Sequence, residues 1–61
     1  MIDTKTYLDF IRKALETDGI QVADKANKIA LESKRITTEQ YSAAARIIVK
    51  AYIAQEEETT E

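Results

Sequence analysis

The chain has 61 residues, a formal net charge of −2, a single glycine, and no cysteine, histidine or proline. Without Cys and His, it has no disulfides, no thiolate chemistry and none of the zinc sites built from these ligands. A domain of this length buries only ~60% of the surface that its unfolded chain exposes, so its own core is marginal. Regular helix packing and self-association remain as sources of stability.

A helical period of apolar residues occurs in three places, and few helix breakers interrupt it, so we expect an all-α, compact three-helix unit. The first helix is predicted over about 4–18, with Asp3 as its N-cap and Gly19 as its stop. Ile2 and Tyr7 occupy the two positions of a hydrophobic staple. Its apolar stripe consists of Thr4, Tyr7, Leu8, Ile11, Ala14 and Leu15.

The second helix is predicted over about 21–33, with a narrow stripe rich in small side chains. The stripe consists of Val22, Ala23, Ala26, Ile29 and Ala30. Leu31 lies about 140° around the helix from Ala26, since each residue turns about 100°. It is therefore either covered by the following turn or exposed.

The third helix is predicted over about 37–54 and has the clearest start. Ile36 and Tyr41 form a staple, while Thr37 and Gln40 form a Thr-x-x-Gln capping box. After it, acids and threonines leave no apolar side chains to order the chain, so residues 55–61 are predicted to be a flexible acidic tail. The helical domain then covers residues 1–54.

Apolar residues on the third helix exceed what one core-facing stripe needs. The predicted core stripe is Tyr41, Ala45, Ile48, Val49 and Tyr52. The surplus on the sides and back is Ala43, Ala44, Ile47, Ala51 and Ala54. A three-helix protein has no fourth element to cover that back, so we expect a second copy or a partner helix there.

A homodimer is the expected form of this assembly. The predicted interface residues are Ala43, Ile47, Ala51, Ala54 and Leu31. In the alternative interpretation, the alanines are helix formers on a solvated face and Ile47 is one exposed apolar residue.

Charge is unevenly distributed, because residues 24–55 carry six basic and three acidic side chains, whereas 56–61 carry four acids. Arg46 and Lys50 form a like-charge pair at i, i+4 spacing, which nearby acids would offset. The candidates are Glu39, an acid of the first helix, or the acidic tail of a neighbouring subunit. The alternative is two solvated cations on a helix flank.

Catalysis is not expected, because no nucleophile with a base and no converging pair of acids is present. The consecutive acids Glu56, Glu57 and Glu58 on a mobile tail make no preformed metal cage, and we expect no cofactor. No secretory signal is visible in residues 1–12, and no apolar run is long enough to span a membrane, so a cytoplasmic location is expected.

The alternative function is a helix-turn-helix-like regulator that binds nucleic acid through the second and third helices. Phosphate contacts would then rest on Lys34, Arg35, Arg46 and Lys50. The turn lacks its customary Gly and the basic charge is weak, which argues against a nucleic-acid partner.

Residues 34–41, Lys-Arg-Ile-Thr-Thr-Glu-Gln-Tyr, follow one predicted helix and open the next. This stretch resembles the basic-Ile-Thr-x-Glu-x-aromatic step of short bacterial and phage helical hairpins, namely SHOCT-type modules and XkdX-type phage proteins. It departs from them by lacking their Gly before the Ile. The resemblance implies an oligomerisation or assembly element rather than an enzyme.

Overall fold

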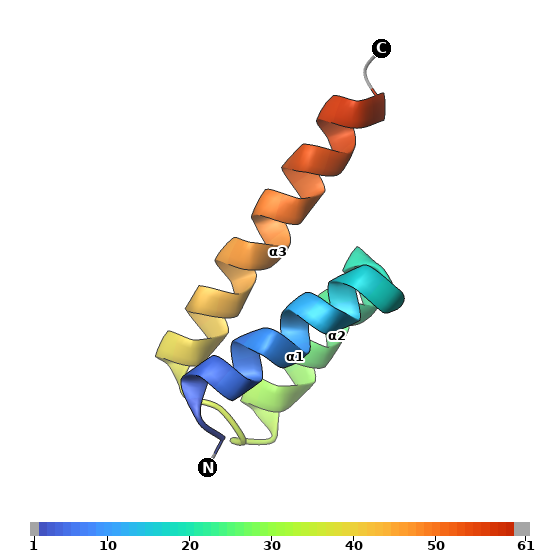
Figure 1. Ribbon diagram of the computed structural model, residues 1–61. Coiled ribbons are helices and arrows are strands. Elements are labelled where there is room, and N and C mark those ends of the chain that lie inside the picture. Colours follow the sequence, from blue (N-terminus) through green and yellow to red (C-terminus); the bar gives the residue numbers. More distant parts are fainter. Residues whose placement is uncertain (1, 60–61) are drawn as a thin grey trace.

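The computed structural model describes residues 2–59, which form three helices: α1 (Thr4–Thr17), α2 (Ile20–Glu32) and α3 (Thr38–Thr59) (Figure 1). These residues include no strand, and each helix packs against the other two, so the all-α, three-helix prediction is confirmed. None of the three helices combines the length and the apolar character needed to cross a membrane.

Both predicted capping motifs are confirmed. The side chain of Asp3 accepts a hydrogen bond from the backbone N–H of Thr6 at 3.3 Å. At the start of α3, the backbone N–H of Gln40 donates to the hydroxyl of Thr37 at 3.1 Å. The N–H of Thr37 donates in return to the Gln40 side chain at 2.9 Å. These bonds satisfy donors that a helix start otherwise leaves without partners.

Gly19 joins α1 to α2 through a left-handed backbone conformation, with a φ of 97°. The N–H groups of Asp18 and Gly19 both donate to the carbonyl of Ala14, at 2.7 and 3.0 Å, and so close the end of α1. α1 ends at Thr17 and α2 begins at Ile20, each one residue earlier than predicted.

The turn from α2 to α3 also uses a left-handed residue, but here it is Lys34, with a φ of 61°. Its N–H donates to the carbonyl of Leu31, and that of Arg35 donates to Ala30, both at 3.0 Å. This pair of bonds is the Schellman ending of a helix, which usually places glycine at the left-handed position. Lys34 therefore takes the position that a glycine usually occupies in this kind of turn.

The core lies where the three helices meet. Its buried apolar residues are Tyr7, Ile11, Ala14, Ala23, Ile36, Ala44 and Ile48. Around them pack the partly buried residues Leu8, Leu15, Ile20, Ala30, Leu31 and Tyr41. The predicted stripe of α1 is largely confirmed, except that Thr4 is exposed.

Asn27, only 1% exposed, connects all three helices within this core. The hydroxyl of Tyr7 on α1 donates to its side-chain oxygen at 2.6 Å. Its side-chain nitrogen donates to the carbonyl of Tyr41 on α3 at 3.3 Å. A buried amide with partners on both sides avoids the cost of an unsatisfied polar group.

A second buried amide, Gln40, fastens the beginning of the chain to α3. Besides its capping bond, its side-chain nitrogen donates to the carbonyl of Ile2 at 2.8 Å and to the hydroxyl of Thr4 at 3.1 Å. Residues 2–4 are thereby tied to a helix that starts more than thirty residues later.

The predicted stripe of α2 is wrong at two positions, because Val22 and Ile29 are each 50% exposed. The buried side of α2 is centred on Ala23 and Asn27 instead. An apolar helical wheel cannot identify this side, since it scores asparagine as a surface residue.

The predicted core stripe of α3 is also wrong in part. Val49 and Tyr52 are 53% and 52% exposed, whereas Ala44, which we had placed at the side or back, is fully buried. Two features explain this difference. The buried side of α3 begins at the polar Gln40, and α3 is longer than α1 and α2. α3 has 22 residues against 14 and 13, so its second half projects beyond the hairpin of α1 and α2 (Figure 1).

α3 continues to Thr59, five residues beyond its predicted end near residue 54. Gln and Glu are good helix formers and no glycine or proline follows Ala54, so nothing in residues 55–59 stops the helix. The tail predicted over 55–61 falls on this last part of α3 and on residues 60 and 61, which lie outside the described part of the chain.

We predict that Lys34→Gly raises the free energy of unfolding by about 0.5–1 kcal/mol, because glycine adopts the left-handed conformation without steric cost. Urea unfolding followed by circular dichroism measures the change. Lys28→Gly is the matched control, since it places glycine inside α2 and should destabilise by about 1 kcal/mol. A loss of stability in Lys34→Gly would contradict the prediction.

We predict that Asn27→Leu lowers the free energy of unfolding by about 2 kcal/mol, because it leaves the buried Tyr7 hydroxyl without its acceptor. Adding Tyr7→Phe to this variant removes that hydroxyl and should cost less than it does in the wild-type chain. Chemical unfolding of the four proteins forms a double-mutant cycle. Equal costs of Tyr7→Phe in both backgrounds would show that the two side chains are not coupled.

Candidate functional site

Ionisable side chains do not converge on any one place in residues 2–56. The two ion pairs of this segment, Asp9 with Arg12 at 3.3 Å and Asp24 with Lys28 at 3.2 Å, each lie within one helix and are exposed. The same residues contain no group of three or more Asp, Glu, His or Cys side chains that could hold a metal ion. The candidate site is therefore sought among exposed apolar residues.

Large apolar side chains are exposed on two surfaces, which meet at a hollow that Val22 and Tyr52 both border. The first is a groove between α1 and α2, which we call the hairpin groove. The second lies on the carboxyl-terminal half of α3; we call it the α3 ridge and define it by Val49, Tyr52 and Ile53, 53%, 52% and 49% exposed.

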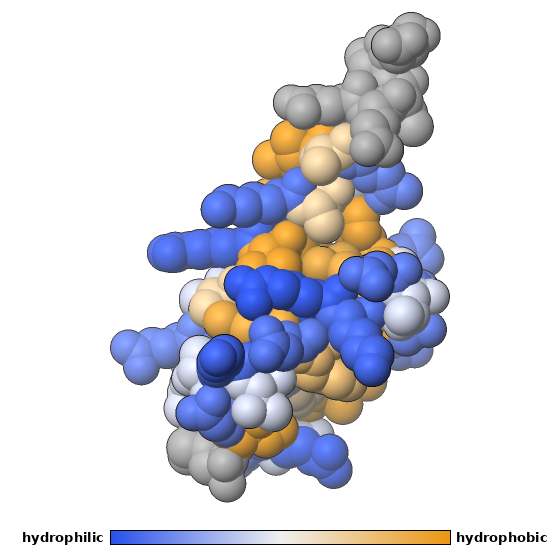
Figure 2. Space-filling model, viewed as in Figure 1, coloured by the Kyte–Doolittle hydropathy of each residue, from blue (hydrophilic) through white to orange (hydrophobic). Residues whose placement is uncertain are grey.

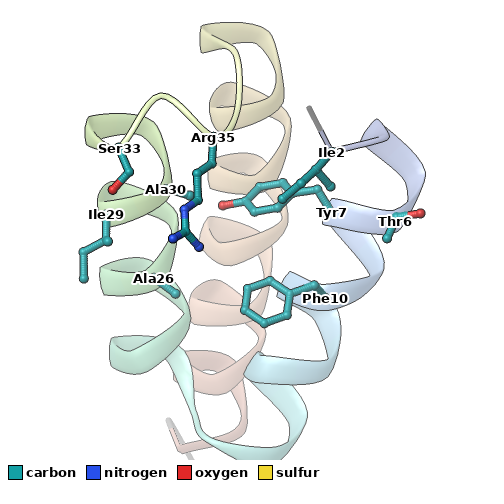
Figure 3. A pocket seen from close by; sticks show the side chains of 9 residues that line it. All are labelled: Ile2, Thr6, Tyr7, Phe10, Ala26, Ile29, Ala30, Ser33 and Arg35. Carbon is teal, nitrogen blue, oxygen red and sulfur yellow. The ribbon is translucent and has the colours of Figure 1, made fainter.

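The hairpin groove has a volume of about 620 Å³ and lies on the side of the hairpin away from α3 (Figure 3). Its lining residues are Ile2, Thr6, Tyr7, Phe10, Ala26, Ile29, Ala30, Ser33 and Arg35. Phe10 projects from α1 into the space between the helices, and Arg35 reaches into it from the turn between α2 and α3 (Figure 3). The rings of Tyr7 and Phe10 lie with their centroids 6.1 Å apart.

A smaller hollow continues the groove toward the turn at Gly19. It shares Phe10 and Ala26 with the groove and adds Val22 as an apolar wall, while Lys13 and Asp18 contribute charges of opposite sign. The hairpin thus carries one continuous apolar channel, whose net positive end is the one at Arg35.

The three residues of the α3 ridge are spaced i, i+3 and i+4, so they share one flank of the helix. Figure 2 shows apolar surface continuing along α3 above the hairpin, between long polar side chains. A side-chain hydrogen bond with Glu56 and the charge of that carboxylate raise the pKa of the Tyr52 hydroxyl. The ridge is therefore apolar at its start and acidic at its carboxyl end.

Of the interface residues predicted from sequence, four lie on α3 outside the ridge, and Leu31 lies on α2. Ala43, Ile47 and Ala51 are partly buried and Ala54 is exposed. Ala51 and Ala54 border a hollow together with Leu15, Gly19, Ile20 and Gln55. Leu31 packs against the core. Contact of these residues with a partner stays a prediction.

Arg46 and Lys50, the predicted charge contacts, are both exposed. They border a shallow hollow on α3 together with Ala45 and Val49, so they lie next to the ridge. Their contact with acids of a neighbour stays a prediction.

Sequence reasoning missed both apolar surfaces. Val49 and Tyr52 were assigned to the core, and Phe10 lay outside every predicted stripe. The signal that points to the ridge is the length of the third apolar pattern, which exceeds that of the two helices before it. For the groove, the signal is Asn27 within the second pattern, because a buried asparagine displaces Val22 and Ile29 outward.

Comparisons with protein-family models, curated proteins and solved structures give no match to this chain. The resemblance of residues 34–41 to SHOCT-type and XkdX-type modules stays a prediction.

We predict an alkaline loss of stability that depends on Tyr7. Burial raises the pKa of the Tyr7 hydroxyl above its ordinary value of 10.0. As the pH rises through this range, the unfolded chain releases the proton first, so the free energy of unfolding falls. Urea unfolding between about pH 8 and 11 should show a shallower fall in Tyr7→Phe than in Tyr41→Phe, which keeps the Tyr7 hydroxyl. Equal slopes in the two variants would contradict this assignment.

Proposed function

We propose that the chain is a non-catalytic interaction protein that self-associates through α3. The observation that carries the proposal is the α3 ridge, three large apolar side chains that remain about half exposed on one flank of α3. Groups of apolar residues left uncovered on a small helical protein are typical of interaction surfaces.

Self-association also supplies what so short a chain lacks. Among the residues whose burial the structure describes, its core contains only seven buried apolar residues, three of which are alanines, so few large side chains contribute to its stability. Small domains of this size often gain stability by forming oligomers. A dimer that covers the ridge would add apolar burial without lengthening the chain.

The ridge alone supports weak association. Full burial of a side chain of this size contributes roughly 1.5–3 kcal/mol, so covering the exposed half yields about 1 kcal/mol per residue. Two copies then gain about 6 kcal/mol, whereas association costs at least about 4 kcal/mol, so the ridge by itself leaves at most about 2 kcal/mol. A dimer that forms below 1 mM needs more than about 4 kcal/mol, so the two copies must also bury apolar surface beyond the ridge. We therefore propose a concentration-dependent equilibrium between monomer and homodimer, strengthened by any further surface that the two copies bury.

We predict that the mass in solution rises above that of one chain between about 10 μM and 1 mM, as measured by sedimentation equilibrium. Ile53→Glu should return the protein to a monomer across this range, because it places a charge in the buried ridge. Ala54→Glu is the matched control, one residue along the helix but on the other flank, and it should leave the dimer intact.

The opposite result, dissociation by Ala54→Glu and not by Ile53→Glu, would support the interface predicted from sequence in place of the ridge. A wild-type protein that stays monomeric at every concentration would overturn self-association on either flank. Circular dichroism of both variants establishes that they remain helical.

A further inference from the structure

The hairpin groove combines apolar walls with one charge. Among the described residues that line it, the guanidinium of Arg35 is the single charged group at neutral pH, and none is an acid. The two ion pairs of residues 2–56 lie elsewhere, so Arg35 has no carboxylate partner in that segment. Arginine stays charged at any physiological pH. The groove therefore presents a positive charge that no described acid compensates.

We propose that the hairpin groove binds one molecule of a medium-chain fatty acid, whose carboxylate pairs with Arg35 and whose alkyl chain lies between α1 and α2. This inference goes beyond the proposed self-association and does not depend on it, because the groove of a single chain forms the whole site. The α3 ridge takes no part in it.

The carboxylate end of the site is the turn between α2 and α3. Arg35 leaves this turn, and its side chain points into the space between α1 and α2 (Figure 3). A guanidinium donates two parallel hydrogen bonds to a carboxylate. Two helices, α1 and α3, begin at this end of the molecule and only α2 ends there (Figure 1). Since a helix carries partial positive charge at its start, this end favours an anion.

The alkyl chain has an apolar path away from Arg35. The groove shares Phe10 and Ala26 with the smaller hollow that contains Val22, so apolar walls continue along α2 from Ala30 to Val22. This stretch is about 12 Å long, at 1.5 Å per residue. The groove volume of about 620 Å³ lies within the range of small-molecule pockets, roughly 300–1,000 Å³. A chain on this path covers side chains that are otherwise half exposed.

The same features argue against other classes of ligand. A cation would be repelled by a guanidinium that has no acid beside it. A small hydrophilic anion such as phosphate would pair with Arg35 but leave Phe10 and Ile29 in water, 53% and 50% exposed. A bilayer surface suits a flat or convex apolar face, whereas this surface is a groove between two helices. One molecule with an anionic head and a single chain satisfies both the charge and the shape.

Decanoate is the probe, titrated at neutral pH below the concentration at which it forms micelles and followed by NMR of isotope-labelled protein. It should shift the backbone amide signals of the groove residues on α1 and α2 in a saturable way, and leave those of Arg46 and Lys50 on α3 unchanged. Shifts centred on the α3 ridge, or shifts that never saturate, would overturn the inference.

Substitution of the arginine tests the charge pairing. Arg35→Gln should weaken decanoate binding at least tenfold, because it removes a charge-assisted pair of hydrogen bonds. Arg46→Gln is the matched control, an exposed arginine outside the groove, and it should leave the dissociation constant within about twofold. Decyltrimethylammonium, which has the same chain and a cationic head, should bind at least tenfold more weakly than decanoate. Equal effects of the two substitutions, or equal binding of the cation, would contradict the pairing.

The alkyl path is tested by chain length and by filling the groove. Decanoate should bind more tightly than octanoate by about two- to fourfold per added methylene, as expected for burial of an apolar chain. Ala26→Leu narrows the groove and should weaken decanoate binding at least fivefold. Ala45→Leu is the control, since Ala45 is also a partly buried alanine but borders a hollow on α3. Circular dichroism establishes that both variants remain helical. Affinity independent of chain length would overturn the alkyl path.

Two further measurements separate this inference from the proposed function. Ile53→Glu alters the ridge and keeps the groove, so it should bind decanoate within about twofold of the wild type. A wild type that dimerises without binding decanoate overturns only this inference, whereas a monomer that binds decanoate overturns only self-association. Co-sedimentation with phosphatidylglycerol vesicles, without saturable binding of monomeric decanoate, would show a membrane surface as the partner and overturn the single-molecule site.

Discussion

The hydrogen bonds of Asn27 determine how the three helices face one another. Its side-chain amide accepts a hydrogen bond from the Tyr7 hydroxyl on α1 and donates one to the Tyr41 carbonyl on α3, so it fixes the rotation of α2 about its own axis. Any other rotation would leave a buried amide or hydroxyl without a partner, which is costly in an apolar core. The small side chains beside it, Ala23 and Ala44, let the helices approach closely enough for these bonds to form.

The burial of Asn27 also explains which apolar side chains are exposed on the surface. Because the amide occupies the inner side of α2, Val22 and Ile29 remain half exposed and border the hairpin groove and its continuation. On α3, the buried side starts at Gln40, which ties the first residues of the chain to the bundle. The core thus uses polar side chains for orientation, and large apolar side chains remain outside it. In the proposed dimer, the exposed apolar side chains of one chain cover those of the other.

Local signals in the sequence predicted the elements well, and long-range contacts were harder to anticipate. The caps at Asp3 and Thr37 are interactions over three residues, so the residue types alone identify them. The stripes of α2 and α3 were predicted from apolar residues only, and they failed where an amide is buried. The pairing of Tyr7 with Asn27, twenty residues apart, leaves no local pattern by which it could be found.

The amino-acid sequence by itself determined the number of helices, their capping and the absence of disulfides, since each depends on residue type or on neighbours within one turn. The tertiary structure alone decided which flanks of α2 and α3 are buried, and therefore where the groove and the ridge lie. The physical reason is that burial depends on the lengths of all three helices and on partners for every buried polar atom. Those conditions are met only when the helices are packed together.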